Sequence, residues 1–152
     1  MTSRTTPSLA QLINRASRAF ARDGDIALKP LGLRYAQVPV IALLHDGEEL
    51  TQKELAEATG MEQPSMAQLL ARMDRDGLVR RTPNPRDARS QTIALTSATD
   101  TRLTDAHDRL AALDRRAVAG FTAAEIDTLK HLLTRVGDNL DRKRDAATDP
   151  AQ

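Results

Sequence analysis

The chain has 152 residues, enough for one domain, and its 40% hydrophobic and 28% charged residues are typical of a globular protein. It has no cysteine, which excludes disulfides, thiolate metal sites and thiol-based redox sensing, and no apolar run approaches the roughly 18 residues that a membrane span needs. The first ten residues lack an apolar signal core, so we expect no membrane partner and a cytoplasmic location, at the nucleoid if the chain binds DNA.

Apolar residues at helical spacing predict a first helix over residues 8–22, which the sequence Asp-Gly-Asp at 23–25 should end. A second helix is expected over 35–45. Pro39 lies early in it, where a missing N–H group costs little.

Two further helices are predicted in the middle of the chain. Thr51 and Glu54 form a capping box that should begin the first of them, and Gly60 should end it. The next helix should begin at 62–65, with Pro64 in its first turn, and stop at Asp76-Gly77. Two helices joined by a tight turn at a glycine predict a helix-turn-helix.

The segments 78–81 and 91–95 alternate well enough to predict two strands. We expect residues 82–90 to join them as a hairpin loop that is too long for a two-residue turn. The sequence thus predicts a mainly α chain with a small two-stranded β-wing, which is a winged helix-turn-helix.

The last third of the chain is expected to be helical, with one apolar stripe over 103–117 and a second helix that starts at a capping box, 122–125. The first and last helices have wider apolar stripes than a small winged helix needs. The simplest partner is a second copy related by a two-fold axis, which predicts a homodimer. The alternative is a monomeric bundle in which the two stripes cover each other.

Arginines are concentrated around the predicted wing. Residues 72–91 contain six arginines against three aspartates, and local positive charge is typical of a polyanion partner. A solvated charged surface is the alternative. In a winged helix the second helix of the helix-turn-helix enters the major groove of double-stranded DNA and the wing overhangs the neighbouring minor groove, so DNA is the predicted partner.

The N-terminal residues of that second helix are expected to meet base edges. Gln63, Ser65 and Gln68 have suitable polar side chains, since glutamine can pair with adenine and serine with several bases. Met66 is expected to give apolar contact, for example to a thymine methyl group. The alternative for Gln63 and Ser65 is that they only cap the helix.

In the wing, Arg86 and Arg89 are expected near the minor groove, whose negative potential attracts a guanidinium. Asp87 should accept a hydrogen bond from an arginine and fix its pose. The remaining arginines are candidates for phosphate contacts: Arg72, Arg75, Arg80 and Arg81.

Residues 50–96, LTQKELAEATGMEQPSMAQLLARMDRDGLVRRTPNPRDARSQTIALT, resemble the MarR family of bacterial transcriptional regulators. The opening Leu-Thr, the Gly-Leu-Val segment, the Asp-x-Arg at 87–89 and the closing Ile-x-Leu-Thr agree in order, and LKPLGL and GMEQPS are similar to the SlyA-like branch. The resemblance implies a two-fold dimer on a palindromic operator. We therefore expect one domain, 1–152, with dimerisation helices at 8–24 and 97–143 and a DNA-binding lobe at 33–96.

The chain departs from the family pattern at three positions. Ala98 stands where the family often has glycine, Ala88 removes one wing arginine, and Gln68 stands where SlyA-like helices often have a basic residue. The last two imply weaker DNA binding or a different specificity.

The resemblance also implies a small, often aromatic and anionic, effector bound between the dimer helices and the winged helix. Four residues are expected to line its site: Arg18, Phe20, Tyr35 and His45. Each has a simpler interpretation, since Phe20 suits a core and His45 can favour a helix dipole.

No catalytic, cofactor or metal site is predicted. The three histidines are dispersed, and the chain has no P-loop, no Gly-rich dinucleotide turn and no nucleophile elbow, which excludes the common enzyme classes. The stronger alternative is a winged helix that binds proteins and never reads DNA.

Overall fold

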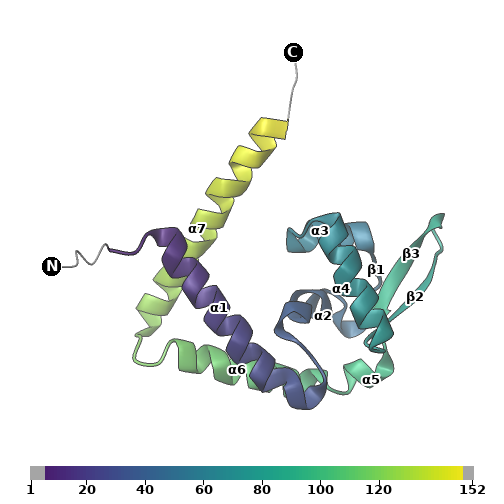
Figure 1. Cartoon of the computed structure of the whole chain (residues 1–152), viewed down its shortest axis with the longest axis horizontal. Coiled ribbons are helices and arrows are strands. Elements are labelled where there is room, and N and C mark those ends of the chain that lie inside the picture. The colour runs from purple at the N-terminus through teal and green to yellow at the C-terminus, as the bar shows by residue number, and fades with distance from the viewer. Residues whose placement is uncertain (1–5, 149–152) are drawn as a thin grey trace. The chain divides into compact units, whose positions relative to one another are not determined.

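The computed structural model describes residues 6–148, and side chains over 6–142. Residues up to Leu113 form one compact unit, and those from Asp114 form a second. Figure 1 labels the helices and strands. The first unit contains α1 (Leu9–Leu28), α2 (Val38–Leu43), β1 (Leu50–Thr51), α3 (Gln52–Thr59), α4 (Gln63–Arg75), β2 (Val79–Asn84), β3 (Asp87–Leu95), α5 (Ser97–Asp100) and most of α6 (Leu103–Ala117). Helix α6 continues into the second unit.

Helix α1 begins at a capping box in which Ser8 and Gln11 exchange hydrogen bonds. The prediction that it ends at residue 22 is wrong, because the helix continues to Leu28. Gly24 is buried within it, and the side chain of Asp25 accepts a hydrogen bond from the backbone N–H of Tyr35 at 2.8 Å. Packing against a distant segment therefore keeps residues 23–25 helical, although their local preference favours a break.

The expected second helix is divided. Residues Tyr35–Gln37 form a 3-10 turn, α2 follows with Pro39 in its first turn, and His45–Gly47 form another 3-10 turn. Asp46 has φ of 61°, which ends the helical path here.

The helix-turn-helix has the predicted boundaries. Thr51 caps α3, accepting from the Glu54 backbone N–H at 3.2 Å, and its own N–H donates to the Glu54 carboxylate at 2.8 Å. Gly60 follows α3 with φ of 68°. Pro64 lies in the first turn of α4, and Gly77 allows the chain to leave that helix with φ of 73°.

The wing belongs to a three-stranded antiparallel sheet with the order β1-β3-β2, rather than to an isolated pair of strands. Leu50 pairs with Ile93 and Thr51 with Thr92, so a short strand was missed. The expected long hairpin loop is also wrong. Strands β2 and β3 extend to Asn84 and from Asp87, which leaves a two-residue turn.

The core of the first unit joins α1, α2 and α6 to the helix-turn-helix and the sheet. Its fully buried large side chains include Leu28, Val40, Leu44, Leu55, Met66, Leu70, Met73 and Ile93. This core fixes α4 and the base of the wing to one scaffold, which leaves the outer face of α4 and the far end of the hairpin to solvent.

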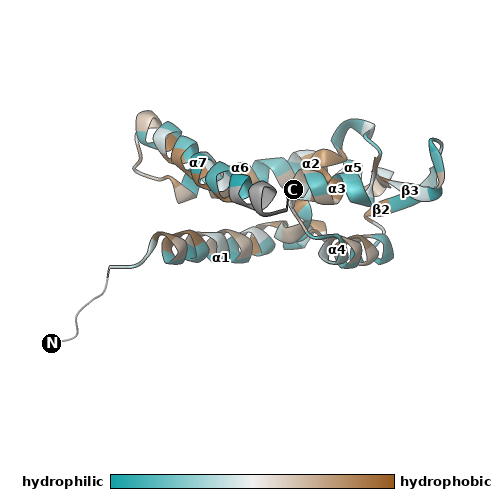
Figure 2. Cartoon of the chain, turned by 90° about the horizontal axis from the view of Figure 1, so that it is seen from above, coloured by the Kyte–Doolittle hydropathy of each residue, from teal (hydrophilic) through white to brown (hydrophobic). Residues whose placement is uncertain are grey.

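The second unit contains α7 (Ala123–Thr148), which starts at the predicted capping box: Thr122 and Glu125 exchange hydrogen bonds at 2.8 and 3.2 Å. Figure 2 shows hydrophobic residues recurring along this helix among hydrophilic ones. Several large apolar side chains of the unit are 41–63% exposed: Phe121, Leu129, Leu132, Leu133 and Leu140. None of the described helices combines the length and apolarity needed to cross a membrane.

Candidate nucleic-acid interface

The outer face of α4 presents three polar side chains at helical spacing. Ser65, Gln68 and Arg72 are three and four residues apart, so they share one side of the helix, and all three are exposed. Gln63 is exposed at the first position, where its Oε1 accepts a hydrogen bond from Gln52 Nε2 at 3.2 Å. The structure thus places Ser65, Gln68 and Arg72 together on one exposed face, with Gln63 exposed at the start of the helix.

Met66 does not belong to this face. Its side chain is completely buried, so the prediction that it contacts a thymine methyl group is wrong. Met66, Leu70 and Met73 follow one another at spacings of four and three, and this stripe packs into the core.

The alternative that Ser65 only caps α4 is not what the structure shows. The capping position is Glu62, and Ser65 is the third residue inside the helix. Glu62 makes no capping hydrogen bond through its side chain. Ser65 is an exposed residue, so it is not sequestered by the core.

Side-chain hydrogen bonds to the backbone form the tip of the wing. Asn84 Oδ1 accepts from the backbone N–H of Arg86 at 3.0 Å, and Asp87 Oδ1 accepts from the backbone N–H of Arg89 at 2.9 Å. Asn84 Nδ2 also donates to Ser90 at 2.9 Å, across the turn. Asp87 therefore fixes the backbone that carries Arg89, whereas the sequence predicted a bond to a guanidinium.

The arginines divide into paired and unpaired groups. Arg80 lies 3.2 Å from Glu49, Arg81 lies 3.5 Å from Asp74, and Arg75 lies 4.0 Å from Asp76. Over the part of the chain that the structure describes, no carboxylate lies within 4 Å of three other guanidinium groups: Arg72, Arg86 and Arg89. The unpaired arginines are the ones most available to an anion.

Glu54, in the first turn of α3, has a pKa below its ordinary value. Hydrogen bonds from the backbone N–H and hydroxyl of Thr51 lower the pKa of Glu54, and the guanidinium of Arg86 lowers it further.

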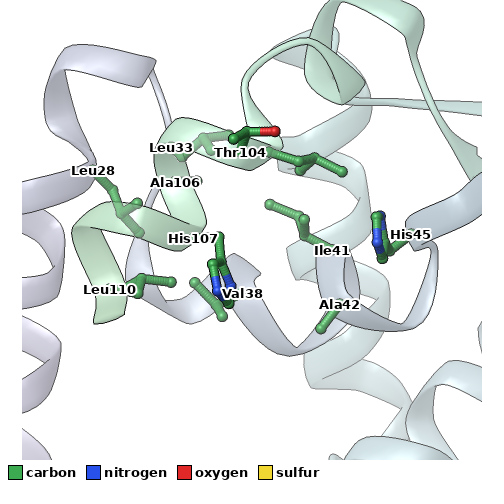
Figure 3. A pocket seen from close by; sticks show the side chains of 11 residues that line it. Leu28, Leu33, Val38, Ile41, Ala42, His45, Thr104, Ala106, His107 and Leu110 are labelled. Atoms are coloured by element: carbon green, nitrogen blue, oxygen red, sulfur yellow. The ribbon is translucent and has the colours of Figure 1, made fainter. Parts of the chain in front are cut away.

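A separate cavity of about 480 Å³ lies within the first unit (Figure 3). Aliphatic side chains dominate its lining, and His45, Thr104 and His107 are its polar members. The lining residues are Leu28, Leu33, Val38, Ile41, Ala42, His45, Leu103, Thr104, Ala106, His107 and Leu110.

The structure brings only one of the four predicted effector residues to this cavity, His45. Tyr35 packs over Gly24, while Arg18 is exposed and Phe20 half-buried on α1. Sequence reasoning missed His107. Its signal was its position next to Ala106 and three residues before Leu110, within the apolar stripe of α6.

Among the described residues, no group of three or more histidine, aspartate or glutamate side chains is placed to hold a metal ion.

Comparisons with known proteins agree with this geometry. Residues 31–90 match a model of the MarR family. An uncharacterized HTH-type transcriptional regulator of Bacillus subtilis, YwoH, is 24% identical, and the match covers 82% of this chain and 90% of that protein.

Solved structures share the fold. A mutant of MarR from E. coli, crystallised with operator DNA, is 27% identical, with a TM-score of 0.78 over 84% of this chain and 92% of that one. The transcriptional regulator SlyA is 18% identical and has a TM-score of 0.83 over 93% of this chain and all of that one. YwoH and SlyA are each described as a transcriptional regulator. Residues 31–90 thus match the MarR family of transcriptional regulators in sequence, and the chain shares its winged helix-turn-helix fold with a solved MarR structure.

Proposed function

We propose that the chain is a sequence-specific transcriptional regulator that binds a palindromic operator as a homodimer and responds to a small molecule. The observation that carries this proposal is the exposed polar face of α4, standing beside a wing whose outer arginines have no acidic partner among the described residues. The related MarR structure with operator DNA supports the same partner.

In this proposal α4 lies in the major groove. Gln63 and Gln68 can each pair with an adenine, and Ser65 can pair with several bases. Arg86 and Arg89 reach the neighbouring minor groove, where they are drawn by its negative potential. Arg72 contacts phosphate and fixes orientation without reading sequence. Arg81 contributes less to DNA binding because Asp74 already neutralises part of its charge.

The apolar side chains left exposed on α7 support a homodimer. Leu132 and Leu133 are nearly half exposed, and Leu9 and Leu12 on α1 are similarly uncovered. A second copy would bury such surfaces symmetrically. Two lobes, each spanning residues 33–96, would then read half-sites about one helical turn apart, held by helices at 8–24 and 97–143.

The cavity of the first unit is proposed as the effector site. Its volume suits a small molecule, and its lining is mainly aliphatic. An anionic group there would meet the imidazoles of His45 and His107, because no lysine or arginine lines the cavity. A small, mostly apolar ligand with one polar group matches this lining.

Footprinting and shift assays on the DNA upstream of the chain's own gene test the proposal. Two-fold symmetric protection is expected, with affinity that falls by roughly 0.9 log units per phosphate contact for each log unit of salt. Such a regulator acts on the chromosome, so we place it in the cytoplasm at the nucleoid. Absence of DNA binding at low salt would instead favour the protein-interaction alternative.

A further inference from the structure

A cleft of about 500 Å³ separates the start of α3 from the wing. Figure 1 shows α3 and the β2–β3 hairpin in the same part of the first unit. One wall comes from the first residues of α3 and the other from the two strands. The lining residues are Thr51, Gln52, Lys53, Arg81, Pro83, Ala88, Arg89, Ser90, Gln91 and Ile93.

The lining of this cleft is cationic. It includes Lys53, Arg81 and Arg89 and no aspartate or glutamate. Lys53 and Arg89 are exposed, and neither side chain has an acidic partner within 4 Å among the residues that the structure describes. The cleft therefore combines two unpaired cations, on opposite walls, with polar groups that can donate hydrogen bonds to an anion.

Strand register explains why one wall combines core and polar residues. Arg81 pairs with Ile93 and Pro83 with Gln91, so these four side chains share one face of the sheet. Ile93 is buried at the base of the wing, while Pro83 and Gln91 are exposed further out. The face that packs on the helices near its base thus becomes an open, polar wall towards the tip.

The cleft adjoins the start of the helix that we place in the major groove. Gln52, in its lining, donates to Gln63 at 3.2 Å, which brings the first residues of α3 and α4 together. With α4 in the major groove and the wing over the minor groove, the sugar-phosphate strand that divides the two grooves must pass between them. The cleft lies between the start of α3 and the wing, and it adjoins that path where Gln52 contacts Gln63.

We infer that this cleft holds a phosphodiester of the strand that divides the two grooves, with Lys53 as its main cation, while Arg89 lines the opposite wall and extends its guanidinium to the minor groove. This inference rests on the proposed DNA binding and adds a residue, Lys53, to the interface. The lysine sits on the first helix of the helix-turn-helix, the element that crosses the backbone in such proteins.

The test compares Lys53→Gln with Lys29→Gln in the full chain. Lys29 is also exposed but follows α1, away from the cleft. For Lys53→Gln the slope of log affinity against log salt should shrink by about 0.9, which is about fivefold weaker binding at 0.15 M salt. The loss should be equal on operator and unrelated DNA, because phosphate contacts carry no sequence information. Lys53→Arg should retain the slope, and Lys29→Gln should match the wild type.

Replacing single phosphates of the DNA by neutral groups identifies the phosphate that Lys53 contacts. Neutral methylphosphonates are placed one at a time along the strand between the grooves. Substitution at one position should weaken DNA binding by the wild type and by Lys29→Gln but have little effect on binding by Lys53→Gln. An unchanged salt slope for Lys53→Gln, in a protein that binds its operator, would overturn the cleft assignment alone. A wild type that binds no DNA would overturn the proposed function as well, so the two failures are distinct.

Discussion

Gly24 lies directly beneath the ring of Tyr35: a Cβ atom placed on Gly24 would come within 2.3 Å of Tyr35 Cδ2 and 2.8 Å of Cγ. No side chain fits in that space. The glycine that was expected to break α1 is instead the position at which the following segment packs against the helix.

Replacing Gly24 by alanine should destabilise the chain by about 1–3 kcal/mol, because the added methyl group forces the tyrosine to move. An alanine in a helix is otherwise favourable by up to about 1 kcal/mol over glycine. Gly137→Ala in α7 is the matched control, since its Cβ would meet nothing within 4 Å. Urea unfolding of both variants gives the comparison, and a more stable Gly24→Ala protein would contradict the packing described here.

Thr51→Ala should lower the free energy of unfolding by about 0.5–2 kcal/mol at neutral pH, because it removes the cap of α3. The lowered pKa of Glu54 makes this effect depend on pH. A carboxylate with a depressed folded-state pKa stabilises the fold above its unfolded value of about 4.3, and this contribution is lost as pH falls through the folded-state pKa. Urea titrations at pH 7 and pH 3.5 should therefore show a smaller difference between Thr51→Ala and wild type in acid. An equal difference in unfolding free energy at both pH values would show that the Thr51 cap does not act through the ionised carboxylate of Glu54.

Arg89→Ala should weaken operator binding without a change in melting temperature, because its guanidinium is exposed and unpaired among the described residues. Arg80→Ala is the contrasting variant. Arg80 already pairs with Glu49, which also accepts from Thr92 at 3.1 Å, so its loss should change DNA affinity less. Binding isotherms and thermal melts on both proteins decide this. Equal losses of affinity would show that the ion pair does not distinguish the two arginines.

Gln68→Ala should relax specificity at one base pair of the operator, by about 1–3 kcal/mol of discrimination. Met66→Leu should leave the preference among operator variants unchanged and alter stability by less than about 1.5 kcal/mol, because Met66 is a core residue. A panel of single-base operator variants measures both. A changed base preference in Met66→Leu would show that Met66 contributes to base recognition after all.

Removal of the chain from Thr122 onward should abolish the homodimer, as sedimentation would show. Leu132→Glu in the full chain is a milder test, because it places a charge on an apolar side chain that is 48% exposed. His131→Glu changes an exposed polar neighbour and should leave the dimer intact. A dimer that survives both the truncation and Leu132→Glu would show that the apolar side chains of α7 do not form the dimer interface. A wild-type chain that sediments as a monomer would favour the alternative in which the helices of one chain cover each other.

Residue patterns were sufficient to predict the boundaries of the helix-turn-helix, because the signals that set those boundaries are local. The Thr51 and Glu54 cap, Gly60 and the turn at Gly77 each fix a boundary through the backbone conformation of a few residues. The core stripe of α4 was also visible, and Met66 was assigned to DNA although its spacing to Leu70 already placed it inside.

Other features depend on contacts that no local pattern contains. Two prolines made the segment 82–90 resemble a loop, but Pro83 lies on edge strand β2, where a missing N–H group is tolerated. Strand β1 has two residues, too few for an alternating pattern. The cavity joins residues of α1, α2 and α6, and only the folded chain shows that His107 lines it while Arg18 does not.

Thr51 is at once the last residue of β1, paired with Thr92 in the wing, and the cap of α3. A single residue thereby couples the strand that borders the wing to the first of the two paired helices, and bending at this joint would disrupt both. On an operator, an extra base pair inserted inside a half-site should therefore be tolerated poorly. One inserted between half-sites leaves the contacts within each half-site intact, although it moves and rotates one half-site by about a tenth of a turn relative to the other, so binding should survive it better.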